Sequence, residues 1–115
     1  MDEILGARPQ ALVFEASNPR HEHEWEDWAA AAIPDDTVLI PGVIDSTSNY
    51  VEHPRLIAQR IGRFADIVGH ERVLAGTDCG FGTFAGMGHV YPSIVWEKMK
   101  ALSQGAALAS AKLWR

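Results

Sequence analysis

The sequence has a single cysteine, Cys79, among its 115 residues, so it cannot form a disulfide within the chain. A chain without disulfides is typical of a reducing compartment, and we expect a cytoplasmic protein. No apolar run approaches the roughly 18 to 20 residues that a membrane-spanning helix needs. The first three residues, Met1-Asp2-Glu3, are acidic, whereas a secretory or transit signal begins with basic residues. We therefore expect neither a membrane anchor nor a leader.

Positive charge is also scarce. The chain has 10 Lys and Arg against 15 Asp and Glu, which gives a formal net charge of -5. Because nucleic acids and anionic membranes attract basic surfaces, this balance argues against both as partners. Hydrophobic residues make up 47% of the chain and charged residues 22%, a composition typical of a folded globular domain and not of a disordered segment. The length fits one domain with a buried core.

Short apolar runs alternate with helical patterns along the chain. The runs at residues 11–14, 37–44 and 72–77 are continuous and partly β-branched, as expected of strands buried on both faces. Pro41 interrupts the second run, and it must lie at a strand end or an irregularity because it cannot donate a ladder hydrogen bond. Helical spacing of apolar residues, with proline and glycine at the boundaries, predicts helices over residues 23–33, 54–68 and 92–113.

This strand–helix alternation, repeated three times, predicts an α/β fold with a parallel sheet and helical crossovers. Three parallel strands leave two unprotected sheet edges. One interpretation is that the chain forms the last three βα units of a (β/α)8 TIM barrel, which usually needs about 250 residues. The other is a small subunit that completes its sheet against another chain, so we expect either a homo-oligomer or a complex with the upstream half of a barrel.

Potential ligands and acids stand at the end of each predicted strand. Glu15 ends the first run, Asp45 ends the second, and Asp78 with Cys79 ends the third. In parallel α/β folds the carboxyl ends of the strands meet at one edge, where functional residues gather. These positions are therefore candidate functional residues. For Asp45 alone, a cap of the following helix or turn remains an equal alternative.

Cys79 lies between Asp78 and a glycine-rich segment that begins at Gly80. A lone cysteine is usually a small buried hydrophobic residue. In this position a thiolate can also ligate zinc or act as a nucleophile, and Glu15 is then a candidate second ligand. Two ligands are fewer than the three protein ligands of an ordinary catalytic zinc site.

The histidines leave several readings open. The run His21-Glu22-His23-Glu24 lacks two histidines one helical turn apart, and residues two apart do not share a helix face. A solvated helix start, or anion contacts beside Arg20, is therefore favoured over a metal site there. His53 precedes Pro54 at an expected helix start, where it can serve as an acid or base, as a cap, or as a surface residue.

Three segments resemble a known family. These are Phe14-Glu15-Ala16-Ser17, Ile40-Pro41-Gly42-Val43-Ile44-Asp45 and Thr77-Asp78-Cys79-Gly80-Phe81. They look like the three C-terminal strand motifs of cobalamin-independent methionine synthase, in order, over roughly residues 9 to 86. The resemblance implies that residues 1–115 are the C-terminal part of a (β/α)8 barrel. It further implies a zinc-dependent methyltransferase acting on a thiol such as homocysteine.

The resemblance also implies roles for individual residues. Glu15 and Cys79 match the glutamate and the last cysteine that hold zinc in the family, whose His-x-Cys ligand pair would lie upstream of this chain. Ser17, Asp45 and Asp78 would position the substrate or the ligands. Thr47 stands where the family has a histidine that donates a proton to methyl-folate, so the methyl or alkyl donor need not be folate. His53, in the same loop, is the candidate replacement, and Asp45 and His53 are the expected catalytic residues.

Two other functions remain open at this point. One is a metal-free decarboxylase-like member of the same barrel superfamily, which also contains uroporphyrinogen decarboxylase; it predicts that serine can replace Cys79 without loss. The other is a non-catalytic fragment or accessory chain that is held against a partner by its sheet edges. The absence of the upstream ligands from this chain favours the second alternative for the chain on its own.

Overall fold

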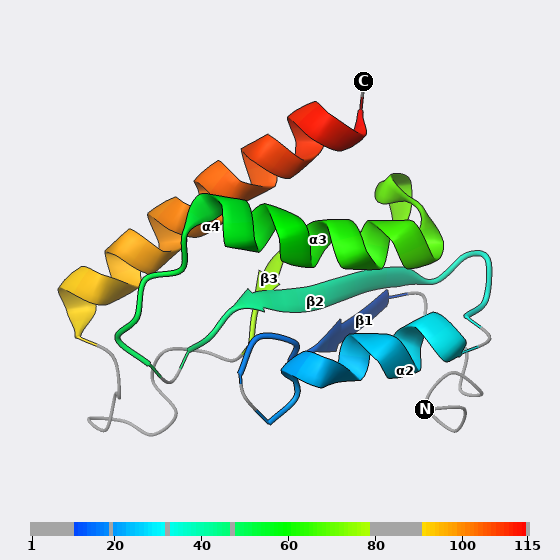
Figure 1. The fold of residues 1–115 in the computed structure, drawn as a ribbon, viewed down its shortest axis with the longest axis horizontal. Coiled ribbons are helices and arrows are strands. Elements are labelled where there is room, and N and C mark those ends of the chain that lie inside the picture. The colour runs from blue at the N-terminus through cyan, green and yellow to red at the C-terminus, as the bar shows by residue number, and fades with distance from the viewer. Residues whose placement is uncertain (1–10, 19, 32, 47, 79–90, 115) are drawn as a thin grey trace.

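A computed structural model describes residues 11–18, 20–31, 33–46, 48–78 and 91–114. Its strands are β1 (Ala11–Phe14), β2 (Val38–Ile44) and β3 (Gly76–Thr77). Its α-helices are α2 (Trp25–Ala30), α3 (Pro54–Val68) and α4 (Pro92–Leu113), and two short 3-10 helices, η1 (Glu22–Glu24) and η2 (His70–Arg72), precede α2 and β3. Strands and helices alternate along the chain, which confirms the predicted α/β class (Figure 1).

The three strands form one parallel sheet in the order β1-β2-β3. Pairing between β1 and β2 ends at Phe14 opposite Pro41, and pairing between β2 and β3 begins with Gly42 opposite Gly76. Pro41 therefore lies inside β2 and not at its end, at the residue where the strand changes partner. The register with β3 shifts between Gly42 and Ile44, which is the irregularity that the proline predicted.

Two predicted elements are longer than the observed ones. The helix expected over residues 23–33 is divided into η1 and the six-residue α2. The strand expected over residues 72–77 is reduced to β3 and an isolated bridge between Val73 and Leu39. Arg72, the first residue of the expected strand, instead ends η2, and its guanidinium donates to the backbone oxygens of Thr37 and Pro34.

Helices α3 and α4 have the predicted boundaries. Proline occupies the first turn of each, where its missing N–H has no helical partner to lose. Gly69 ends α3 with a φ of 97°, a conformation that glycine adopts at low cost. Although α4 has 22 residues, no helix within the described ranges is long and apolar enough to cross a membrane.

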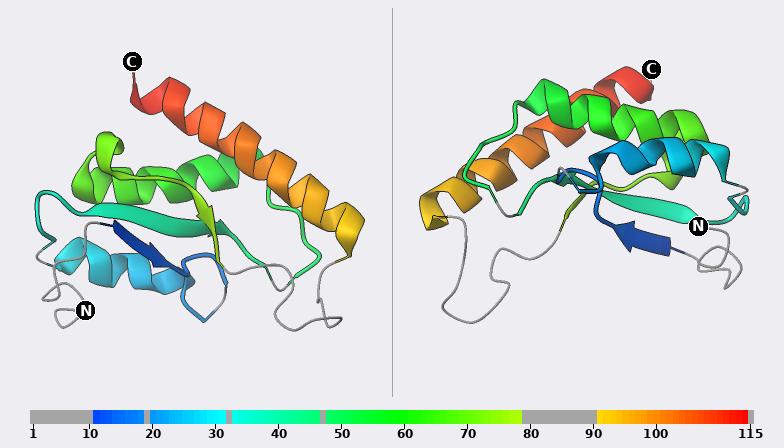
Figure 2. Two further views of the ribbon diagram at one scale, coloured as in Figure 1. Left: turned by 180° about the vertical axis from the view of Figure 1, so that it is seen from behind. Right: turned by 60° about the horizontal axis from the view of Figure 1, so that its bottom comes forward.

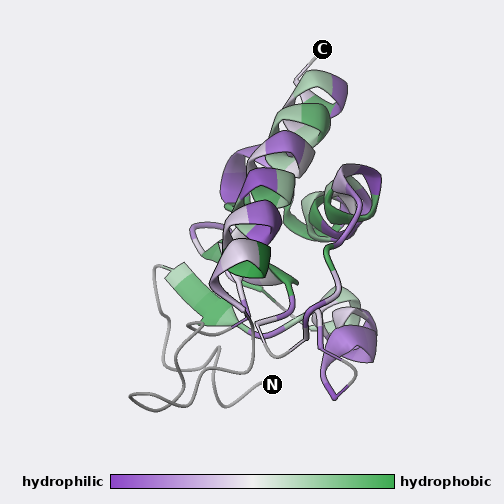
Figure 3. Ribbon diagram, turned by 90° about the vertical axis from the view of Figure 1, so that its left-hand side faces the viewer, coloured by the Kyte–Doolittle hydropathy of each residue, from purple (hydrophilic) through white to green (hydrophobic). Residues whose placement is uncertain are grey.

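The helices lie on one face of the sheet, and no other described segment covers the opposite face (Figure 2). One core cluster joins Phe14 and Leu39 of the strands to Trp28 of α2 and Phe64 of α3. A second cluster joins β2 to α3 and α4 through residues that include Val43, Ile44, Ile57, Ile61, Ala101 and Ala109. Figure 3 shows hydrophobic strands beside helices that are part hydrophobic and part hydrophilic, as expected of helices with one buried face.

Candidate functional site

The carboxyl ends of the three strands come together at one edge of the sheet. Glu15, Asp45 and Asp78 each follow the last residue of a strand. The backbone N–H of Asp78 donates to the oxygen of Ile44 at 3.0 Å, which joins the end of β3 to the end of β2. The Asp78 side chain reaches in turn to the loop after β1, as described next. The predicted convergence of strand ends is therefore present in the described residues.

Asp78 fastens the loop after β1 to the end of β3. Its Oδ1 accepts hydrogen bonds from the backbone N–H of Ala16 at 2.9 Å and of Ser17 at 3.0 Å. Its Oδ2 accepts a third, from Asn18 Nδ2 at 3.0 Å. Burial raises the pKa of the Asp78 carboxyl; the three hydrogen bonds act in the opposite direction, and the neighbouring charge of Asp45 adds to the rise. Both oxygens are thus engaged by the protein itself.

Gly42 makes this arrangement possible. A Cβ at this position would lie 2.2 Å from Asp78 Oδ1 and 2.6 Å from Asp78 Cα. No side chain fits there, so β2 must carry glycine for the end of β3 to approach it so closely. The backbone oxygen of Gly42 also accepts a hydrogen bond from Ser17 Oγ at 2.5 Å. Ser17, predicted to bind substrate, therefore holds its own loop against β2.

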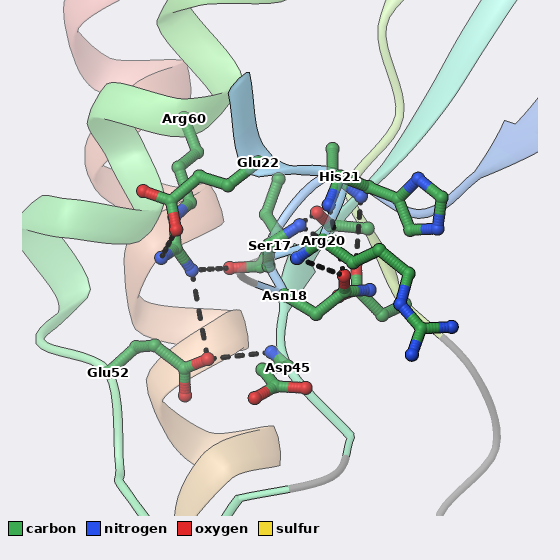
Figure 4. A network of polar contacts seen from close by, with 12 residues as sticks. Ser17, Asn18, Arg20, His21, Glu22, Asp45, Glu52 and Arg60 are labelled. Atoms are coloured by element: carbon green, nitrogen blue, oxygen red, sulfur yellow. Dashed lines mark hydrogen bonds and ion pairs between the residues drawn. The ribbon is translucent and has the colours of Figure 1, made fainter. Parts of the chain in front are cut away.

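Asn18 connects the same carboxylate to the segment that follows. Its Nδ2 donates to Asp78, and its Oδ1 accepts from the backbone N–H groups of Arg20 and His21, each at 3.1 Å. The backbone oxygen of Asn18 accepts from Glu22 at 2.9 Å. The side chain and backbone oxygen of Asn18 together set the position of residues 20–22 relative to the end of β3 (Figure 4). Asn18 was not among the functional residues predicted from the sequence.

Glu15 lies beside an imidazole. Its Oε2 is 3.1 Å from His21 Nε2, and the other ring nitrogen, His21 Nδ1, is 2.9 Å from Glu24 Oε1. About a third of each of these side chains is exposed, so the group lies at the surface of the sheet edge. The run His21-Glu22-His23-Glu24 therefore contacts the end of β1 through His21 and Glu15. The spacing of the run alone did not indicate this contact.

A buried ionic network supports the loop after β2. Glu52 Oε2 accepts from the backbone N–H of Asp45 at 2.7 Å, and Glu52 Oε1 accepts from Lys98 Nζ at 2.8 Å. Lys98 is fully buried and Glu52 nearly so. The network therefore ties the candidate residue Asp45 to α4, which is far from it in the sequence.

Arg60 of α3 completes this network (Figure 4). Its Nη1 donates to the backbone oxygen of Val43 at 3.0 Å and lies 3.7 Å from Glu52 Oε2, while its Nη2 lies 3.9 Å from Glu22 Oε2. None of the three residues of the network was predicted as functional from the sequence. One indication was present: Lys98 falls on the same helical stripe as Ala101, which faces the core.

The remaining candidate residues have different settings. His53 is exposed at the N-terminus of α3, where its Nδ1 accepts from the backbone N–H of Arg55 at 3.0 Å, so the predicted capping role is confirmed.

Cys79 and Thr47 lie outside the described residues. Within the part of the chain that is described, no group of three or more His, Cys, Asp or Glu side chains is arranged to hold a metal ion. Glu15 and His21 offer oxygen and nitrogen donors that suit zinc.

Comparison with solved structures identifies a similar fold. The structure of a B12-independent methionine synthase from Shewanella sp. W3-18-1, in complex with selenomethionine, matches with a TM-score of 0.77 and 18% sequence identity. The match covers 97% of this chain and 30% of that chain. No family model and no curated protein sequence matches this chain. The likeness establishes that this chain has the fold of a part of that larger enzyme.

Proposed function

We propose that this chain is the C-terminal part of a methionine-synthase-like enzyme that transfers a methyl or alkyl group to a thiol. In this proposal a zinc ion is held in part by Glu15 and Cys79. The supporting observation is the hydrogen bond from the N–H of Ala16 to Asp78 Oδ1, at 2.9 Å. Ala16 follows Glu15 and Asp78 precedes Cys79, so this bond joins the chain positions next to the two proposed ligands.

The donor set fits zinc, because carboxylate oxygen and thiolate sulfur are both among its protein ligands. When bound, zinc supplies Lewis acidity that lowers the pKa of a coordinated thiol and makes a thiolate available near neutral pH. That thiolate would be the nucleophile toward the carbon of the methyl or alkyl donor, whose leaving group would depart with the bonding electron pair. Ser17 and Asp78 hold the loop that carries Glu15 during this reaction.

Asp45 and His53, in the loop after β2, are the proposed catalytic residues, and Asp45 also binds substrate. Since His53 Nδ1 accepts the N–H of Arg55, the ring proton of the neutral imidazole belongs on Nε2. In this proposal Nε2 donates that proton to the leaving group. Glu52 fixes the backbone of Asp45, so the position of the loop depends on the buried network of Glu52, Lys98 and Arg60.

We further propose that the remaining zinc ligands come from a polypeptide that supplies the rest of the barrel. The chain spans 30% of the length of the similar synthase, and a catalytic zinc site ordinarily takes three protein ligands. Among the described residues, β1 and β3 are the edge strands of the sheet, and the missing strands would add to them.

Co-expression with the preceding part of the Shewanella synthase barrel tests the proposal. We expect a complex that contains about one zinc ion, measured by mass spectrometry of the metal. Cys79→Ser and Glu15→Gln should abolish this zinc, whereas Glu26→Gln, on an exposed position of α2, should not change it. A complex in which Cys79→Ser retains all its zinc would refute the assigned ligands and favour the metal-free, decarboxylase-like alternative.

A further inference from the structure

We propose that the groove between α3 and α4 binds an acidic amphipathic helix of a partner protein. The groove lies on the side of the two helices that faces away from the sheet, so it is separate from the strand ends. The proposal therefore does not depend on zinc or on the proposed function. Three features carry it: the length of the groove, its apolar floor, and the basic side chains along its rim.

Two adjoining cavities of about 610 and 590 Å³ make up the groove. They lie between α3 and α4, which are side by side (Figure 2) and touch at Gly105, where a Cβ would lie 2.5 Å from Ile57 Cβ. Arg55 and Leu108 line both cavities, so the two are continuous. Together they follow α3 over residues 54–66, roughly 18 Å at 1.5 Å per residue, which is a little over three helical turns.

The floor of the groove is apolar. Ala58, Ala109 and Leu113 line the larger cavity, and nothing lies within 4 Å of the position that a Cβ would take on Gly62. Leu108, at the junction of the two cavities, is 46% exposed. An exposed leucine in a concave surface between two helices is what the apolar face of a third helix packs against. The floor thus provides a central apolar contact with room around it.

The rim of the groove is basic, although the chain as a whole is acidic. Residues 54–115 contain eight of the ten basic residues and four of the fifteen acidic ones. Arg55, Arg63 and Lys112 line the larger cavity, and none of them forms an ion pair with another described residue. Asp66 is the acidic residue in the same lining. Carboxylates along the rim are therefore attracted, whereas a basic partner is repelled.

The spacing of the basic side chains favours a helix over a small anion. Arg55 and Arg63 are eight residues apart on α3, roughly 12 Å along the helix axis. Arg63 is held toward α2, since its Cζ lies 5.5 Å from the centroid of the Trp25 ring. The two guanidinium groups therefore suit separate carboxylates and not one phosphate. A helix laid along α3 reproduces this spacing with its own acidic residues and directs the apolar residues between them at Leu108.

Completion of a barrel leaves the groove open. Added strands would pair with β1 and β3, and the helices that they bring would extend the helical layer at its ends. The groove lies instead between two helices that are already adjacent. On α3 it is opposite to the buried residues Ile57, Ile61 and Phe64, which face the sheet. Its occupant therefore comes from outside the barrel.

Synthetic peptides test the proposal on the 115-residue chain. The probe is an amidated helical peptide of about 14 residues, with leucines along one face and glutamates on both sides of them. Nitrogen-15 NMR titration should show shifts in the amide resonances of α3 and α4 that line the groove, and added salt should weaken binding. Two matched peptides, with lysine for each glutamate or alanine for each leucine, should bind at least tenfold more weakly.

Charge-reversed variants assign the contact to the groove. Lys112→Glu should weaken binding of the acidic peptide about three- to tenfold, whereas Lys100→Glu, exposed on the same helix outside the groove, should leave it unchanged. Arg55→Glu with Lys112→Glu should reverse the preference, so that the lysine peptide binds more tightly than the acidic one. Both positions are exposed, and unchanged resonances of the sheet show that the variant is folded.

Four results would overturn the proposal. The first is no binding of the acidic peptide at millimolar concentration, and the second is binding that Lys112→Glu and Lys100→Glu affect equally. The third is a bound peptide that circular dichroism shows to be non-helical. The fourth is self-association of the chain that Arg55→Glu with Lys112→Glu abolishes, because the occupant is then a second copy of this chain.

Discussion

At the scale of single residues, Asp78 is the side chain on which most of the candidate site depends. It accepts three hydrogen bonds from consecutive residues of one loop, and it does so from a buried position. Burial and hydrogen bonding act on its ionisation in opposite directions, and burial prevails, so its pKa is raised. The carboxylate that positions the loop is thus also a group whose charge costs free energy in the folded chain.

The raised pKa of Asp78 predicts a pH dependence of stability. Because its pKa is raised, Asp78 keeps its proton in the folded chain in a pH range where the unfolded chain has lost it. The contribution of Asp78 to the free energy of unfolding is therefore full below the unfolded pKa. It is lost as pH rises through the folded pKa. We therefore compare the free energy of unfolding of the parent chain with that of Asp78→Asn. The advantage of the parent over the variant should shrink as pH rises through this range. Urea unfolding at a series of pH values measures it. A difference that grows with pH would contradict the assignment.

Gly42 offers a second prediction at this scale. Gly42→Ala should destabilise the chain by about 1 to 3 kcal/mol, because the new Cβ meets the backbone of Asp78, which cannot rotate away. Gly62→Ala is the matched control, since nothing lies within 4 Å of a Cβ there and the site is inside α3. It should stabilise the chain by about 0.5 to 1 kcal/mol. Urea unfolding compares the two variants. If both substitutions change the free energy of unfolding equally, the ends of β2 and β3 can move apart at little cost, and the close approach at Gly42 is not needed.

At the scale of elements, the buried network of Glu52, Lys98 and Arg60 connects the loop after β2 to two helices. Lys98→Met should destabilise the chain by about 3 to 5 kcal/mol, because it removes one partner and leaves the Glu52 carboxylate buried. Lys100→Met, two positions along α4 and exposed, should change stability by less than about 0.5 kcal/mol.

A double variant separates the cost of a lost partner from the value of the ion pair. Glu52→Gln with Lys98→Met should recover part of the loss, since the buried side chain that faced Lys98 is then neutral. Thermal unfolding of the single and double variants measures the coupling. Strict additivity of the two single effects would mean that the two side chains do not stabilise each other.

The elements also show what the sequence can predict. Pro54, Pro92 and Gly69 are local signals, so the ends of α3 and the start of α4 were predicted correctly. The length of β3 was overestimated, because apolar residues after Arg72 form a strand pattern, while the contacts of Arg72 itself are with carbonyl groups far away in sequence. The strand-end carboxylates were predictable from strand periodicity. The link from Glu52 to Lys98 was not, because it joins side chains 46 positions apart.

At the scale of the whole molecule, one face of the sheet has no covering layer among the described residues. Val13 lies between Leu12 and Phe14, which pack toward the helices, so alternation directs Val13 to the opposite face. Its side chain is 70% exposed, and Leu74, near β3, is 58% exposed. Exposed apolar residues on a parallel sheet are unusual, because such sheets are normally buried on both faces. If the chain is part of a larger barrel, as we propose, this face is the barrel interior that other strands would complete.

This interpretation predicts that the chain associates through the sheet. In gel filtration with light scattering, the parent chain should elute above its monomer mass, and Val13→Lys should shift it toward the monomer, because a charged side chain on the uncovered face opposes burial. The same substitution should prevent assembly with the upstream barrel part. Trp96→Gln is the control, since Trp96 is 73% exposed on α4 and belongs to the helical layer. If Trp96→Gln disperses the assembly and Val13→Lys does not, the helices form the interface, and the sheet face then needs another explanation.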